Sequence, residues 1–272
     1  MIVKSFGDMI CAGQYSLHSS FSHFRNFISP DREIVGITTK SELVGPANIL
    51  LSECNLKKID NLKILQDRLH IEGEIFAKKS LNFFNSDVQF THPNPTLTYS
   101  NCVKVEKYLQ KNSPPESLIQ IVKSQDERGF KAEIAKRLKM SFLSLEKRDY
   151  EGFTKGISGV GFGLTPSGDD YLCGVLFATH ILEKIFGTNY TKAREIIYTN
   201  ATSKRVISNH FLKLAKLNRA QKTLKSFILT LTKNTSNIEL IKKTKTLQKF
   251  GSTSGSDLCW GIVRTLILNP FK

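Results

Sequence analysis

A glycine-rich stretch in the middle of the chain combines residue types that are suited to binding a small anion. Its sequence from 156 to 176 is GISGVGFGLTPSGDDYLCGVL, with glycines at the alternate positions 159, 161 and 163. Glycines let backbone N–H groups approach a ligand, and the apolar segment that follows predicts a helix whose N-terminus points at the same place. The spacing fits neither a Walker A loop nor a Rossmann fingerprint. A tight loop leading into a helix capped by Ser167 or Asp169 remains an equal alternative.

A second copy of the pattern lies near the C-terminus, where residues 251–268 read GSTSGSDLCWGIVRTLIL. Ser167-Gly168-x-Asp170-x-x-x-Gly174 is repeated there as Ser254-Gly255-x-Asp257-x-x-x-Gly261. Each copy opens an apolar segment of helical type, so we expect the two helices to pack through Gly174 and Gly261. Their loops would then converge into one binding site. Two independent helix starts are the alternative.

The acids of these motifs limit what the site would bind. Helix N-termini and glycine amides favour anions, whereas Asp169, Asp170 and Asp257 would repel a bare phosphate or carboxylate. Mg²⁺ resolves this conflict, because it binds carboxylates, waters and substrate oxygens together. The sequence therefore makes Mg²⁺ a candidate cofactor, with simple capping by the acids as the alternative.

Other polar residues offer weaker signals. His18, Ser19 and Asn26 lie among phenylalanines in SLHSSFSHFRNF, which would either line a ligand cleft or form the wet face of a half-buried element. The six histidines have no zinc-ligand spacing. Cys173 and Cys259 lie inside the two motifs, where helix packing is the expected role.

Two kinds of element must position these residues. Short β-branched and aromatic segments separated by turn signals predict a β-rich part over 1–95, as a small sheet or barrel. A proline-containing stretch over 91–100 suggests a linker. Apolar residues at helical spacing then predict a helical part over 101–272, which holds both loops. Within it we expect helices near 131–147, 169–185, 191–217, 220–232 and 236–249. The predicted fold is α+β, with the β-rich part packed on the helical part.

The composition narrows the class of protein. The net charge is +15, and residues 204–249 hold twelve basic side chains with Glu239 as their one acid. Lysines number 29 and arginines 10, a ratio more typical of solvated helix faces than of nucleic-acid readout, although attraction of an anionic metabolite also fits. The longest nearly apolar run, 171–182, is too short to span a membrane. With no signal peptide pattern and five scattered cysteines, we expect reduced thiols and a cytoplasmic location.

The motifs also resemble a known family. The run GVGFGLTPSGDDYLCG resembles the signature of the AllH family, which includes a subunit associated with oxamate carbamoyltransferase in anaerobic allantoin degradation. GSTSGSDLCWG is similar to the second motif of that family, and LHSSFSHFRNF and GPANILL resemble its N-terminal region. The resemblance implies a metabolic enzyme subunit in purine catabolism with partner subunits, and chemistry in which oxalurate and phosphate give oxamate and carbamoyl phosphate.

The resemblance also implies residue roles. It makes Asp169, Asp170 and Asp257 metal or substrate contacts, and it leaves the catalytic residue unknown. The residues expected to bind a small carbamoyl, phosphate or carboxylate ligand are Gly161, Gly163, Thr165, Ser167, Gly168, Ser254, Gly255, His18 and Ser19. The alternative to an enzyme subunit is a noncatalytic assembly or regulatory subunit whose loops serve packing. Nonspecific nucleic-acid binding is a third, weaker hypothesis.

Overall fold

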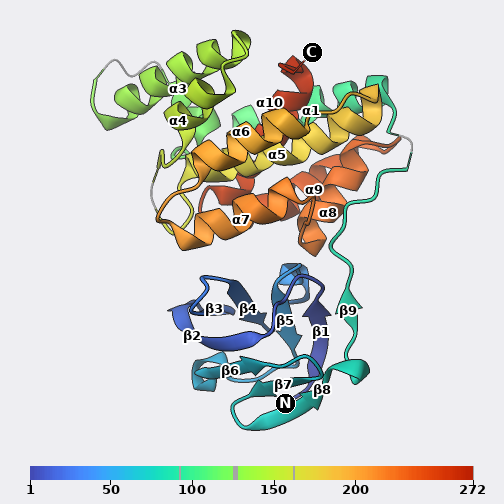
Figure 1. Cartoon of the computed structure of the whole chain (residues 1–272). Coiled ribbons are helices and arrows are strands. Elements are labelled where there is room, and N and C mark those ends of the chain that lie inside the picture. Colours follow the sequence, from blue (N-terminus) through green and yellow to red (C-terminus); the bar gives the residue numbers. More distant parts are fainter. Residues whose placement is uncertain (92, 125–127, 162, 272) are drawn as a thin grey trace. The chain divides into compact units, whose positions relative to one another are not determined.

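The computed structural model describes residues 1–91, 93–124, 128–161 and 163–271 (Figure 1). Their contacts divide the chain into two compact units. The first, which we call the sheet unit, consists of Met1–Asp87 and Arg219–Lys225. The second, the helical unit, consists of Val88–Asn218 and Ser226–Lys272. The predicted α+β class is confirmed.

The sheet unit is a curled, half-barrel sheet whose nine strands in the described residues have the order β8-β7-β6-β2-β3-β4-β5-β1-β9. Most neighbours are antiparallel, while β4 with β5 and β1 with β9 are parallel. The strands are β1 (Val3–Gly7), β2 (Gly13–Ser20), β3 (Phe24–Ile28), β4 (Ile34–Thr38), β5 (Asn48–Leu51), β6 (Asn61–Ile64), β7 (Arg68–Ile71), β8 (Glu74–Ala77) and β9 (Phe83–Phe84). Short 3₁₀ turns are η1 (Ser41–Leu43), η2 (Leu56–Lys58) and η3 (Lys78–Ser80).

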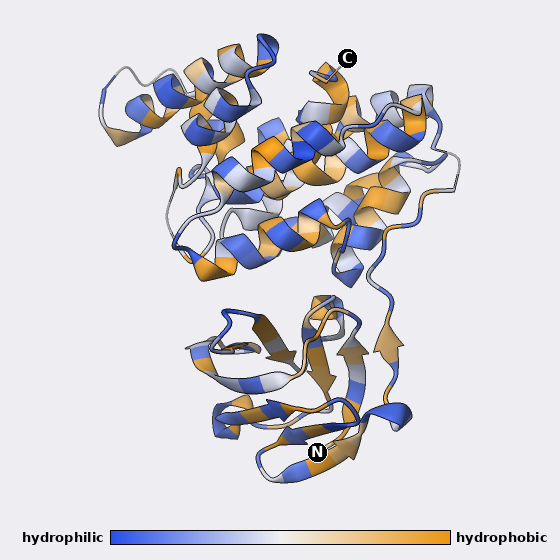
Figure 2. Cartoon of the chain, viewed as in Figure 1, coloured by the Kyte–Doolittle hydropathy of each residue, from blue (hydrophilic) through white to orange (hydrophobic). Residues whose placement is uncertain are grey.

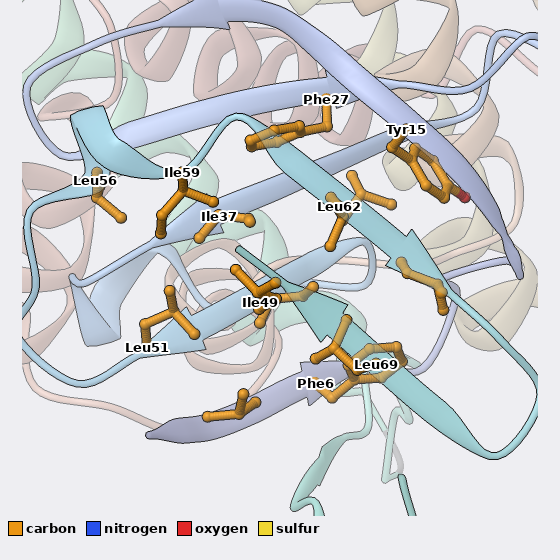
Figure 3. Packing of buried hydrophobic residues seen from close by; sticks show 14 residues of the cluster. Phe6, Tyr15, Phe27, Ile37, Ile49, Leu51, Leu56, Ile59, Leu62 and Leu69 are labelled. Atoms are coloured by element: carbon orange, nitrogen blue, oxygen red, sulfur yellow. The ribbon is translucent and has the colours of Figure 1, made fainter. Parts of the chain in front are cut away.

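The core of this unit follows from the alternation of side chains along its strands. In β6 and β7 the apolar residues Leu62, Ile64 and Leu69 are fully buried, while their neighbours face outward. Figure 3 shows these and other strands directing apolar side chains into one cluster. The labelled members are Phe6, Tyr15, Phe27, Ile37, Ile49, Leu51, Leu56, Ile59, Leu62 and Leu69.

A segment from much later in the chain completes the sheet unit. The N–H of Ala220 donates to the carbonyl of Ser86 at 3.0 Å, and the N–H of Lys222 donates to the carbonyl of Val44 at 2.8 Å. Arg219 also forms an ion pair of 3.3 Å with Asp8. Residues 219–225 therefore belong to this unit, although the helix Val206–Lys216 precedes them and the helix Lys222–Leu231 begins within them.

The helical unit is built around α5 (Ser167–Phe186), which is buried on nearly every side. Its main partner is α10 (Ser254–Leu268). The remaining helices are α1 (Pro95–Asn112), α2 (Leu118–Lys123), α3 (Phe130–Glu146), α4 (Tyr150–Ile157), α6 (Thr191–Ala201), α7 (Val206–Lys216), α8 (Lys222–Leu231, shared between the units) and α9 (Asn237–Gln248). In Figure 2 the helices around this centre alternate hydrophilic and hydrophobic stretches, as amphipathic helices do.

Two expectations about local structure need correction. The helix predicted over 191–217 is two helices, α6 and α7, separated at 202–205. The linker expected over 91–100 already contains the start of α1, because Pro95 occupies the first turn and Asn94 caps it by accepting the N–H of Leu97 at 2.9 Å. Proline is tolerated there because first-turn N–H groups have no partner within the helix.

Across the described part of the chain, no helix combines the length and apolar character that crossing a membrane requires.

Candidate functional site: paired glycine-rich loops

Helices α5 and α10 pack through their glycines, as the repeated motif predicts. A Cβ added at Gly174 would lie 2.3 Å from the carbonyl oxygen of Leu258, and one added at Gly261 would lie 2.2 Å from that of Tyr171. Tyr171 and Leu258 occupy matching positions in the two motifs. The contact is therefore reciprocal, and it requires glycine at both positions because a side chain would strike backbone.

The two loops meet where these helices begin. The hydroxyl oxygens of Thr165 and Ser254 lie 3.3 Å apart, and those of Ser167 and Thr253 lie 3.1 Å apart. Each pair joins one loop to the other, so the predicted convergence of the loops is confirmed. The positive ends of two helix dipoles consequently lie side by side.

Neither helix is capped by the side chain of its own N-cap residue. The N-cap of α5 is Pro166, so the alternative in which Ser167 or Asp169 caps this helix does not hold. Among the described residues, the backbone N–H groups of Ser167 and Ser254 make no hydrogen bond. These are matching positions, and each leaves a donor without a partner at the start of its helix.

The local backbone structure explains why glycine occupies the other motif positions. Gly161 and Gly163 have φ values of 104° and 93°, which favour glycine over residues with a Cβ. A Cβ at Gly168 would lie 1.9 Å from the carbonyl oxygen of Ile157, and one at Gly255 would lie 2.0 Å from that of Leu247. Each loop is thus tightly folded against the helix before it, α4 or α9. The ligand-binding role predicted for these glycines stays a prediction.

Asp169 is engaged by an arginine that the sequence analysis did not select. Its side chain is buried, and its Oδ2 lies 2.8 Å from Nε of Arg205. Its Oδ1 accepts the backbone N–H of Gly159 at 2.8 Å. The charge of Asp169 is therefore balanced, and the same carboxylate holds the glycine-rich loop in place.

Asp170 and Asp257 are buried without a cationic partner among the residues described. Burial raises the pKa of the Asp170 carboxyl well above its usual range; hydrogen bonding from Ser254 opposes this and the nearby charge of Asp257 adds to it. Burial likewise raises the pKa of Asp257 to about 7. The N–H of Leu118, which donates to Oδ1 of Asp257 at 2.7 Å, acts in the opposite direction and lowers this pKa. Within the described residues, Oδ2 of each carboxyl has no hydrogen-bond partner. Two matching polar atoms are thus left unsatisfied beside the joined loops.

Few other side chains that could bind a metal ion lie near the predicted metal ligands. No cluster of three or more His, Cys, Asp or Glu suited to a metal ion occurs in the described part of the chain. A cation here would depend on Asp170, Asp257 and the loop hydroxyls. Cys173 and Cys259 are buried, and burial raises the pKa of both thiols, which fits the packing role expected for them.

His18 and Ser19 lie on β2 in the sheet unit, whereas both loops lie in the helical unit. The β2–β3 pairing has an irregularity between Leu17 and Ser19, and His18 Nδ1 lies 3.3 Å from Ser19 Oγ. Ser19 Oγ also accepts from Nδ2 of the buried Asn26 at 2.9 Å. His18 itself is exposed. Substrate binding by His18 and Ser19 stays a prediction.

The comparison with known proteins bears on the loops directly. No curated protein and no solved structure matches the chain. Residues 157–266 match the model of the AllH family, described as oxamate carbamoyltransferase subunit AllH. This segment contains both loops, α5 and all but the last two residues of α10. The resemblance predicted from the two motifs is therefore confirmed over this segment.

Proposed function

We propose that the protein is a cytoplasmic metabolic enzyme subunit, related to oxamate carbamoyltransferase, that binds a small anionic metabolite at the paired loops. The metabolite would carry a carbamoyl, phosphate or carboxylate group. One observation carries the proposal: the two motifs meet through the Thr165–Ser254 and Ser167–Thr253 contacts, inside the segment that matches the family. The subunit description of that family supports partner subunits in a complex.

The chemistry of the joined loops supports an anion. Two adjacent helix N-termini, each with an unused N–H group at Ser167 or Ser254, favour negative charge. Arg205 balances Asp169, so that carboxylate no longer repels a ligand. Asp170 and Asp257 are the remaining acids, and burial favours their neutral forms.

Protonation of Asp170 and Asp257 is one way to remove their repulsion of an anion, and a bound Mg²⁺ is a second. We therefore keep Mg²⁺ as a proposed cofactor. The unpartnered Oδ2 atoms of Asp170 and Asp257 would be its carboxylate ligands, with waters and ligand oxygens completing its shell. Protonated carboxyls and a bound cation differ in one measurable respect. Ligand binding that depends on Mg²⁺ is abolished by EDTA, whereas binding to protonated carboxyls is not.

A thermal-shift screen of the whole chain tests the proposal. Phosphate, carbamoyl phosphate and oxamate are each added with Mg²⁺ or with EDTA. A true ligand at a hundred times its dissociation constant stabilises the folded state by about 2.7 kcal/mol, which is easily detected. We expect at least one of the three to raise the melting temperature. No response to any of them would leave the loops as packing devices.

The alternative is a noncatalytic assembly or regulatory subunit. It is favoured by the complete burial of Asp257 and by the packing of Gly168 and Gly255 against backbone, which serve structure without a ligand. It predicts no shift in the screen, together with co-purification of partner subunits that carry the transferase activity.

A further inference from the structure

Arg205 reaches the first glycine-rich loop from a different helix. It is the N-cap residue of α7 and the last residue of the break at 202–205. Its Nε donates to Asp169 Oδ2 at 2.8 Å, and its Nη2 donates to Ser158 Oγ at 3.0 Å. Ser208, one turn further along α7, donates to the carbonyl of Leu164 in the same loop at 3.4 Å. The guanidinium is therefore held against the loop by fixed contacts.

These contacts leave one nitrogen of the guanidinium unused. Among the described residues, Nη1 of Arg205 makes no hydrogen bond, while Nε and Nη2 are occupied by Asp169 and Ser158. A Cβ placed on Gly159 would lie 3.0 Å from Nη1 and 3.2 Å from Cζ and Nη2, so glycine at this position lets the loop backbone lie close to the guanidinium. The side chain of Arg205 is 35% exposed, which leaves it accessible to a solute.

A second unsatisfied group lies in the first turn of α5, the helix that the loop leads into. Asp170 directly follows Asp169, its side chain is more than nine-tenths buried, and its Oδ2 has no partner in the described residues. The N–H of Ser167 is unused there as well. The first turn of α5 and Arg205 together thus present unfilled hydrogen-bonding positions of both kinds, donors and an acceptor.

We propose that Arg205 is the residue that binds the oxyanion of the ligand, a carboxylate or phosphate group, through Nη1. This inference rests on the proposed function, because it assigns the charged contact of that same site. Asp169 acts as a positioning residue: it occupies Nε and Nη2 and so directs Nη1 away from itself. Lysine would not replace Arg205, since its single ammonium group would be taken by Asp169.

Binding of inorganic phosphate and of oxamate to the full chain tests the assignment, since the two probes separate the phosphate from the carboxylate source. The variants are Arg205→Lys, which keeps the charge, and Arg205→Gln, which removes it. The control is Arg219→Gln, which removes an equal charge from the ion pair with Asp8. We expect both Arg205 variants to bind the active probe at least tenfold more weakly, and Arg219→Gln to bind it as the parent does.

A folding defect is separated from a binding defect by a compensated variant. Asp169→Asn combined with Arg205→Gln replaces the ion pair by two amides, so that removal of the guanidinium leaves no unpaired carboxylate at position 169. The fluorescence of Trp260, the sole tryptophan of the chain, reports whether the packing of α10 is kept. We expect this double variant to fold and to have lost the binding.

The outcomes distinguish failure of the Arg205 assignment from failure of the proposed function. If the parent binds a probe, and Arg205→Lys and the folded double variant bind it equally well, the role of Arg205 is overturned. The proposed function would then still stand. A parent that binds none of the probes, carbamoyl phosphate included, would contradict the proposed function itself. Equal weakening by Arg219→Gln would show a general charge effect and would also overturn the assignment to Arg205.

Discussion

The acids of the first loop differ in role although they are adjacent in sequence. Asp169 is paired with Arg205 and accepts the N–H of Gly159, so its carboxylate stabilises the loop conformation. Asp170 has no cationic partner among the described residues and an unsatisfied Oδ2. Helix geometry explains the difference, because consecutive residues are about 100° apart around the axis and face different neighbours.

Asp170→Asn separates a ligand contact from a structural acid. Asparagine keeps the shape and removes a charge that burial and Asp257 both disfavour, so we expect the melting temperature without ligand to hold or rise slightly. If Asp170 binds Mg²⁺ or the ligand, the Mg²⁺-dependent ligand shift should disappear. The measurement is a thermal-shift titration with Asp149→Asn, at the N-cap of α4, as the matched control. A full shift in Asp170→Asn would remove Asp170 from the proposed site.

His180, on α5, predicts a pH dependence of stability. Burial and the charge of Arg194 lower its pKa from 6.5 to about 4. The nearby Glu183 raises this pKa, but Glu183 is already paired with Arg194 at 2.9 Å. Between these pH values the unfolded chain binds a proton that the folded chain does not. His180 therefore contributes a loss of stability as pH falls from 6.5 to 4, of about 3 kcal/mol at most.

Urea denaturation between pH 7 and pH 4 measures this loss. His180→Gln is the informative comparison, because a glutamine amide still has a donor for the carbonyl of Lys216, which His180 Nε2 contacts at 2.9 Å. The variant should lose less stability over the same pH range. An identical pH profile in the two proteins would exclude His180 as a source of the effect.

The pairing of α5 and α10 depends on a close backbone approach at one crossing point. Leu258 and Tyr171 each place a carbonyl where the Cβ of the opposite glycine would lie. The same crossing sets the distance between the two loops, because each loop is continuous with its helix. Packing of the helices and the geometry of the candidate site are therefore coupled.

Gly174→Ala should separate these helices. The added Cβ would lie 2.3 Å from a backbone oxygen, which no side-chain rotation relieves, and we expect a loss of about 3 kcal/mol. Gly187→Ala, at the end of the same helix, is the control: its φ of 67° costs about 1 kcal/mol, and nothing lies within 4 Å of the new Cβ. Chemical denaturation compares the two. Equal losses would show that the crossing tolerates a side chain.

The chain passes between its two units more than once. The first part of the sheet unit ends at Asp87, residues 219–225 return to that unit, and Ser226 begins the last part of the helical unit. Asp8 receives this return segment by accepting from the N–H and hydroxyl of Ser86 and by pairing with Arg219. Neither unit is therefore one continuous stretch of sequence.

Hydrogen exchange tests this assignment in the intact protein. The amides of Ala220 and Lys222 donate to Ser86 and Val44, so they should be protected together with the strands of the sheet unit. Asp8→Ala should speed exchange of peptides covering 219–225 at least several-fold and leave α9 unchanged. If the substitution has no effect on that segment, Asp8 does not hold it.

Much of the candidate site was accessible from the sequence because its signals are local. The repeated Ser-Gly-x-Asp-x-x-x-Gly spacing predicted two helix starts, their packing through Gly174 and Gly261, and the meeting of their loops. Short β-branched and aromatic segments between turn signals predicted a β-rich part, and helical spacing of apolar residues predicted the rest. These features follow from periodicity and backbone preference, which act over a few residues.

Only the tertiary structure decided which charges face the loops. The sequence placed Arg205 inside one long helix, so nothing indicated that the chain breaks there and turns its guanidinium toward Asp169 and Gly159. The N–H of Leu118 at Asp257 and the return of residues 219–225 to the sheet unit were equally hidden. In each case the partners are distant along the chain, and the contact arises because packing brings them together, which leaves no periodic or compositional trace in the residues between them.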